Sequence, residues 1–220
     1  MKGKTKSIRN AFRQYGLKGG MSFYSYDIIK KLFKIEIRKS TFFVRKLEDC
    51  KYEGPDFQSL SLEDFEVAAD NEKNPIRWFT KDKMRIIDNR LKRSGLAVFG
   101  RFEEGILSCH GWINYDANSI GKVGLNNHDA YLFDDFTDFH FRGRGYQRQI
   151  IKFRLKEARD KGCERAWSNV YSFNHVSKKN YMKCGFIPVI RLWAVRFKNG
   201  KVKNKFTYLP NSIIDFMKIR

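Results

Sequence analysis

The chain has 220 residues, 42% of them apolar, which suits one domain with a core of its own. Its formal net charge is +20, from 44 Lys and Arg against 24 Asp and Glu, and this excess favours an anionic partner. No apolar run approaches the roughly 20 residues of a membrane-spanning helix, which argues against an integral helical membrane protein.

The predicted elements begin with a basic amphipathic helix within residues 20–39. Apolar residues from Ile28 to Ile35 recur near helical spacing, with lysines around them. Such a helix can dock on the domain and complete its core, or it can lie on an anionic bilayer at the inner face of the membrane. We therefore expect a basic, partly helical extension at residues 1–40 and a single domain at residues 41–220.

From Thr41 onward the hydrophobic period alternates between strand and helix, in the order β-αα-βββ-α-β-α-ββ. Ser61 and Asp64 are spaced as a capping box, and glycines close the later helices. This pattern predicts a mixed α/β fold. The strands are expected at 41–47, 96–102, 105–116, 130–139, 163–172, 188–197 and 201–209, and the helices at 60–70, 81–93, 145–161 and 175–184.

The positive charge is concentrated at the two ends of this series. Residues 1–40 contain eleven Lys and Arg against two acids, a net charge of +9, and residues 191–220 contain eight against one, a net charge of +7. The 150 residues between them carry only +4. The ends are therefore suited to nucleic acid, an acidic membrane surface or a phosphorylated carrier, although solvated basic ends are the simpler alternative.

Cysteine and histidine usage bears on the compartment and on metals. The four cysteines stand far apart without a C-x-x-C pair, which predicts free thiols in a reducing compartment. The four histidines are not spaced as metal ligands, so we expect no metal. The N-terminus is basic but lacks the apolar stretch of a secretory signal, and we expect a cytoplasmic protein.

The chemistry is concentrated at residues 142–145, Arg-Gly-Arg-Gly, between a predicted strand and a predicted helix. Gly143 and Gly145 let the backbone turn tightly, and the helix start adds unpaired N–H groups and the positive end of the helix dipole. Together these features favour a phosphate site, with Arg142 and Arg144 at its rim. A nucleic-acid contact and a purely structural turn are the alternatives.

Two motifs extend this observation. Arg142 to Gln147 fit the form [Q/R]-x-x-G-x-[G/A], except that Gln147 stands in place of the last small residue. The form N-x-x-[A/S]-x-x-x-Y-x-x-x-G-F is matched by Asn174, Ser177, Tyr181, Gly185 and Phe186. In these motifs and in element order, about three-quarters of the chain resembles the GNAT superfamily of acyl-CoA-dependent acyltransferases. The resemblance implies a single α+β domain whose mostly antiparallel sheet of six to seven strands is flanked by helices.

The resemblance also implies an acyl-CoA cosubstrate, most simply acetyl-CoA. Asn174 would contact its pantetheine arm, or would act only as the N-cap of the following helix. The main chain of the strand before the loop would bind the same arm, where that strand splays from the next. The cofactor-binding residues would be Phe136 and Thr137 for the arm, and for the pyrophosphate Arg142, Gly143, Arg144, Gly145, Tyr146 and Gln147, with the two arginines as charge partners.

In the family a tyrosine lies near the CoA sulfur, and Tyr181 falls at that position. A phenol there can protonate the departing thiolate as general acid. Asp134 or Asp135 is a candidate general base, and because strand neighbours face opposite sides, only one of the two can face the acyl group. Asp138, His110 and a water relay are alternatives. The implied reaction is direct transfer to an amine or hydroxyl, without a covalent acyl-enzyme.

The acceptor is not part of either motif. Members of the family bind acceptors through N-terminal helices and the terminal hairpin, and both regions are basic here. This favours an anionic acceptor such as a cell-envelope or polysaccharide precursor, with residues 20–39 on the inner membrane face. One alternative is a nucleic-acid-binding protein, including an acetyltransferase that modifies aminoacyl-tRNA. Another is a GNAT-like scaffold that does not catalyse acyl transfer.

Overall fold

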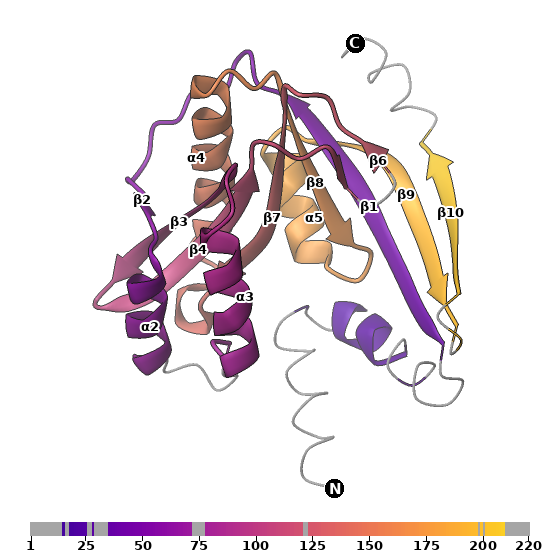
Figure 1. Cartoon of the computed structure of the whole chain (residues 1–220), viewed down its shortest axis with the longest axis horizontal. Coiled ribbons are helices and arrows are strands. Elements are labelled where there is room, and N and C mark those ends of the chain that lie inside the picture. The colour runs from indigo at the N-terminus through magenta and orange to yellow at the C-terminus, as the bar shows by residue number, and fades with distance from the viewer. Residues whose placement is uncertain are drawn as a thin grey trace, which may run out of the picture. The chain divides into compact units, whose positions relative to one another are not determined.

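The protein was analysed as a computed structural model that describes residues 15, 18–25, 28, 35–71, 78–120, 123–197, 199 and 201–209. The chain forms two compact units (Figure 1). We call residues 45–168 the central unit, and residues 1–44 with 169–220 the end unit. Within the residues described, no helix combines the length and hydropathy needed to cross a membrane.

The central unit is built on a mixed sheet with the strand order β8-β7-β4-β3-β2. Strands β7 and β8 are parallel and the other neighbours are antiparallel, and a tight hairpin turn joins β3 to β4. The strands are β2 (Gln58–Ser59), β3 (Leu96–Glu103), β4 (Ile106–Asn114), β7 (Asp129–Thr137) and β8 (Arg165–Tyr171), and β5 (Ser119–Ile120) and β6 (Val123–Gly124) form a separate small ladder.

Helices cover both faces of this sheet, because successive side chains of a strand point to opposite faces and apolar side chains lie on both. Side chains of His110 and Trp112 on β4 lie on the face that packs with α2 (Leu62–Asp70) and α3 (Lys81–Leu91), whereas Gly111 between them faces α4 (Tyr146–Asp160). The core under α2 and α3 comprises Leu60, Phe65, Ala68, Phe79, Ile87, Val98, Leu107, Trp112 and Phe136.

The helix boundaries follow the predicted caps. The Ser61 side chain accepts a hydrogen bond from the backbone N–H of Asp64, whose carboxylate accepts one from the N–H of Ser61, so the capping box is confirmed. Thr80 caps α3 with its hydroxyl oxygen, which accepts a hydrogen bond from the backbone N–H of Lys83 at 3.3 Å. The helix after the Arg-Gly-Arg-Gly loop ends before Gly162, whose φ of 81° lies in the left-handed region that favours glycine.

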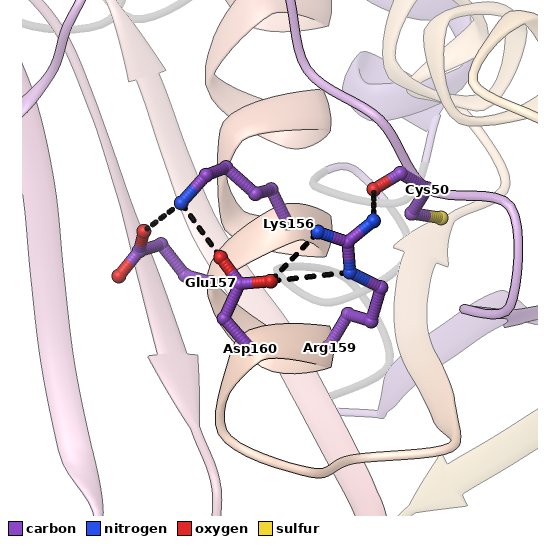
Figure 2. Close-up of polar contacts among 5 residues, drawn as sticks. All are labelled: Cys50, Lys156, Glu157, Arg159 and Asp160. Atoms are coloured by element: carbon purple, nitrogen blue, oxygen red, sulfur yellow. Dashed lines mark hydrogen bonds and ion pairs between the residues drawn. The ribbon is translucent and has the colours of Figure 1, made fainter.

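The C-terminal part of α4 carries a cluster of ion pairs (Figure 2). Lys156 Nζ lies 2.7 Å from Asp160 Oδ2 and 3.3 Å from Glu157 Oε1, and Arg159 Nη2 lies 2.8 Å from Asp160 Oδ1. Exposed pairs of this kind are screened by solvent and contribute little to stability. The hydrogen bond from Arg159 to the carbonyl of Cys50, at 2.7 Å, ties the segment after β1 to the helix, as does the edge-on contact between the rings of Tyr52 and Phe153, whose centroids are 5.6 Å apart.

The end unit contains the antiparallel strands β10, β9 and β1 in that order, and α5 (His175–Lys183). The strands are β1 (Glu36–Lys46), β9 (Ile187–Arg196) and β10 (Val202–Tyr208). Strand β1 therefore crosses the expected boundary at residue 40. The expectation of helix at residues 36–39 is wrong, because Ile37 and Lys39 also alternate with period two and pair with β9.

The described part of the N-terminal helix is docked on Phe173, in the C-terminal half of the end unit. Tyr15 and Phe23 pack around Phe173, with ring centroids at 4.8 and 5.5 Å. A Cβ atom on Gly19 would lie 2.4 Å from the carbonyl oxygen of Phe173, so this close approach requires glycine. Docking is thus the arrangement observed for residues 18–25. Most of the predicted helix from 26 to 34 lies outside the described residues.

The prediction of a mixed α/β fold with a mostly antiparallel, open sheet flanked by helices is confirmed. The seven predicted long strands correspond to β1, β3, β4, β7, β8, β9 and β10. The short strands β2, β5 and β6 were not predicted, since two residues are too few to show a period.

Candidate functional site

The glycine-rich loop of the central unit presents a row of backbone donors. Gly143 and Gly145 have φ angles of 83° and 85°, a region that glycine adopts without strain. Within the part of the chain that the structure describes, the backbone N–H groups from Gly143 to Tyr146 donate no hydrogen bond, and no side chain caps α4. These donors stand at the positive end of a 15-residue helix, which is the arrangement that binds phosphate groups.

The two arginines of the loop differ in their surroundings. Arg142 Nε donates to the carbonyl oxygen of Thr137 at 3.3 Å, so this side chain is turned back toward the end of β7. Arg144 is exposed, with its guanidinium carbon 5.2 Å from the ring centroid of Phe141. Arg144 is therefore placed at the rim of the donor row, where its charge can meet a phosphate.

Strand β7 carries a β-bulge just before this loop. On β4, Trp112 pairs with Phe133 and His110 pairs with Phe136, so Asp134 and Asp135 together lie opposite one residue. Asp134 has a φ of 52°, in the left-handed region. The parallel ladder between β7 and β8 ends at Leu132 and Ser168.

Beyond that point, among the described strands of the central unit, β7 pairs only with β4. The main chain from Phe133 to Thr137 thus forms a strand edge on its other side. An extended ligand that carries amide groups can pair with such an edge. A short 3-10 helix, η1 (Phe139–Phe141), joins this edge to the donor row of the loop.

A buried arginine of α4 holds the bulge. Arg154 is fully buried, its Nη1 donates to the carbonyl oxygen of Trp112 at 2.6 Å, and its Nη2 pairs with the carboxylate of Asp135. A Cβ atom on Gly111 would lie 2.5 Å from Arg154 Cζ, so the guanidinium fits here only because residue 111 has no side chain. Gln147 Nε2 also donates to Asp135, at 3.3 Å. Gln147, the departure from the motif, is therefore turned toward the bulge.

Most of the central unit and part of the end unit match a known protein family. The acetyltransferase (GNAT) family matches residues 56–186, which include the bulge, the loop, Asn174 and Tyr181. The chain belongs to the GNAT acetyltransferase family. No curated protein matches it.

Solved structures share the GNAT fold with this chain. A GNAT-family acetyltransferase from Colwellia psychrerythraea is 21% identical with a TM-score of 0.52, over 73% of this chain and 55% of that one. A GNAT-family acetyltransferase from Novosphingobium aromaticivorans is 13% identical with a TM-score of 0.51, over 73% and 63%. The chain thus spans about three-fifths of the length of these proteins. At such identities the likeness shows the fold alone.

Cations hold both acids that were expected as GNAT general bases. Asp134 Oδ2 lies 2.6 Å from Lys83 Nζ and also pairs with Arg90. Burial raises the pKa of Asp134, but the charge of Lys83 and the hydrogen bonds from Lys83 and Arg90 outweigh it and hold the pKa at about 2. Asp135 is held by Arg154 on the opposite side of the strand. Asp134, whose anion is stabilised in this way, is a weak base.

His110, the histidine alternative, is enclosed by aromatic rings. Its ring stacks on Phe136 with centroids 5.2 Å apart and meets Phe65 edge-on at 5.3 Å. Burial lowers the pKa of His110 to about 3. Neither ring nitrogen has a hydrogen-bond partner among the residues that the structure describes. The imidazole is therefore neutral at pH 7 and a weak proton acceptor.

The remaining predicted GNAT residues belong to the end unit. Asn174 Oδ1 accepts a hydrogen bond from the backbone N–H of Ser177 at 3.1 Å, so its role as N-cap is confirmed and its contact with pantetheine stays a prediction. Tyr181 is buried, stacks on Phe43 at 6.2 Å and meets Phe186 edge-on at 5.0 Å. Its role as general acid also stays a prediction.

The sequence interpretation missed Arg154, which does more than any predicted residue to shape the β7 edge. A signal was present, since Arg154 falls at i+4 from Ile150, i+3 from Ile151 and i−4 from Ala158, which are all buried. A charged residue on the apolar face of a helix has to find a partner in the interior. The bulge itself has no local signal, because it depends on the register with β4.

The ion pairs of Asp134 predict a pH-dependent contribution to stability. The pKa of this carboxyl is about 2 in the folded protein and 3.8 ordinarily, so its contribution is complete above about pH 4 and is lost as the pH falls toward 2. Asp134→Asn should lower the free energy of unfolding by about 2 kcal/mol at pH 7. Urea unfolding across this pH range should show the difference from wild type shrinking in acid.

The matched control is Glu66→Gln, an exposed acid in the middle of α2. This variant should follow wild type at every pH. A difference between Asp134→Asn and wild type that stays constant from pH 7 to pH 2 would contradict the proposed electrostatics.

Proposed function

We propose that the protein transfers an acyl group, most simply acetyl, from acyl-CoA to an amine or hydroxyl of an anionic acceptor. The row of N–H donors from Gly143 to Tyr146 at the start of α4 carries this proposal. The donors suit the pyrophosphate of CoA, and the exposed guanidinium of Arg144 adds charge at the rim. The edge of β7 at Phe136 and Thr137 suits the amide groups of the pantetheine arm.

The chemistry of the transfer is a direct displacement. A lone pair of the acceptor attacks the thioester carbonyl and gives a tetrahedral oxyanion, whose collapse forms the new acyl bond, breaks the carbon–sulfur bond and expels a thiolate. Tyr181 would protonate that thiolate as general acid. The acceptor proton would leave through ordered water, because Asp134 and Asp135 are held by cations and His110 has a pKa of about 3.

The charge of the end unit supports an anionic acceptor. This unit holds 22 Lys and Arg against three acids, a net charge of +19, whereas the central unit holds 22 against 21. The acceptor would thus meet a strongly positive surface. A lipid-linked or nucleotide-linked saccharide has the required charge, and so does an aminoacyl-tRNA. Cys50, Cys109 and Cys163 are free thiols, in keeping with the cytoplasm as the place of action.

Charge reversal at the loop tests the donor site. Arg144→Glu should weaken acetyl-CoA binding about tenfold or more, because a carboxylate would face the pyrophosphate. Isothermal titration calorimetry measures this directly. The matched control is Lys152→Glu, an exposed position two turns further along α4, which should bind as wild type does. Equal losses in the two variants, or none in either, would refute the placement of the pyrophosphate.

Removal of one hydroxyl tests the general acid. Tyr181→Phe keeps the buried ring, so acetyl-CoA should still bind, whereas kcat should fall about a hundredfold because the thiolate leaves unprotonated. The loss should shrink for an acetyl thioester whose thiol is more acidic than that of CoA. Tyr208→Phe, at an exposed position of β10, is the control. An unchanged kcat in Tyr181→Phe would remove this residue from the mechanism.

A further inference from the structure

The end unit carries almost all of the net positive charge, and it also carries most of the exposed large apolar side chains. Of the twelve exposed large apolar side chains among the described residues, nine belong to this unit, although it is the shorter of the two. Acyl transfer to an anionic acceptor would account for the charge, but it does not explain the exposed apolar side chains. The nine are Met21, Tyr24, Ile28, Tyr171, Val176, Met182, Trp193, Val202 and Tyr208.

The N-terminal helix has two apolar faces, one docked and one exposed. Its inner face is docked, with Gly19 and Phe23 against Phe173. Met21, Tyr24 and Ile28 are spaced at i, i+3 and i+7, so they share another face, which we call the apolar stripe. These side chains are 58%, 38% and 37% exposed. The stripe is therefore left uncovered after the helix has docked.

A second surface, which we call the cationic sheet face, lies on β1, β9 and β10. The cross-strand row of Lys39, Trp193 and Lys205 is followed on the same face by Lys203. Lys39 Nζ lies 3.3 Å from the ring centroid of Trp193, which is 44% exposed. Among the described residues of these strands the only acid is Glu36, and it falls on the opposite face.

Glu36 is moreover neutralised where it stands. Arg38 Nη2 lies 2.7 Å from its carboxylate and Arg196 Nε lies 4.0 Å from it. The positive charge of Lys203 and Lys205 therefore has no acidic counterpart on their own face of the described strands. A surface of this kind attracts an anionic partner.

We propose that the end unit binds the surface of an anionic lipid bilayer. Lipid headgroups would neutralise the cationic sheet face, Trp193 would sit at headgroup level, and the apolar stripe would enter the boundary of the acyl chains. The combination favours this partner over nucleic acid. An RNA strand could pair with the lysines and stack on Trp193, but it would leave Met21 and Ile28 in water. The proposal does not depend on the acyl transfer.

Co-sedimentation of the full chain with vesicles tests the proposal. The protein should bind vesicles of phosphatidylcholine with phosphatidylglycerol and should not bind vesicles of phosphatidylcholine alone. Lys39→Gln/Lys203→Gln/Lys205→Gln should weaken binding about a hundredfold, since each lysine near an anionic surface contributes about fivefold. Met21→Ser/Tyr24→Ser/Ile28→Ser should weaken it about tenfold or more.

Matched variants of the central unit are the controls, and each should bind as wild type does. Lys51→Gln/Lys81→Gln/Lys152→Gln removes as many lysine charges, and Val67→Ser/Ile86→Ser removes exposed apolar side chains. Fluorescence gives an independent readout, because Trp193 is the most exposed tryptophan among the described residues. Its emission should shift to the blue with anionic vesicles.

Three results would overturn the proposal. The first is failure to distinguish anionic from neutral vesicles. The second is an equal loss of vesicle binding in the lysine variants of both units. Binding would then depend on the net charge of the protein and not on the cationic sheet face. The third is tight, salt-sensitive binding of single-stranded RNA that needs the three lysines and is indifferent to the apolar stripe, together with no binding to vesicles. Thermal unfolding of each variant separates lost binding from lost folding.

Discussion

A buried ion pair between Arg154 and Asp135 joins the two elements that make the candidate donor site. Arg154 comes from α4, whose first turn follows the glycine-rich loop, and Asp135 belongs to the bulge of β7. Removal of one partner from such a pair leaves an unpaired buried charge and typically costs about 3–5 kcal/mol. The same guanidinium donates to the carbonyl of Trp112, and Gly111 leaves room for it. The strand edge and the donor row are thus fixed relative to each other through one side chain.

The two units carry different parts of the proposed function. The central unit is nearly neutral and holds the features expected of a CoA site, namely the edge of β7 and the start of α4. The end unit has almost all of the net charge, the uncovered apolar stripe and the cationic sheet face. Such a division suits an enzyme whose donor is a common soluble metabolite and whose acceptor is met at an anionic surface. Donor binding and surface binding can therefore be impaired separately.

Local signals in the sequence were enough for most elements and for the family. Caps such as Ser61 and Thr80, and glycines such as Gly162, act within a few residues, so they appear in the sequence as they do in the structure. Residues 36–39 were misassigned because Ile35 and Ile37 fit a strand period as well as the end of the helical pattern, and pairing with β9 decides between them. The bulge and the course of the Arg154 side chain depend on contacts between distant segments. Gln147 was read as a departure from the motif, and only its hydrogen bond to Asp135 explains it.

A crystal structure of the protein with CoA bound would test the central claim most directly. We expect the pyrophosphate oxygens within hydrogen-bond distance of the backbone N–H groups from Gly143 to Tyr146, and the pantetheine amides paired with the main chain of β7 near Phe136 and Thr137. A pyrophosphate bound elsewhere, or held by side chains alone while the loop donors contact only water, would contradict it.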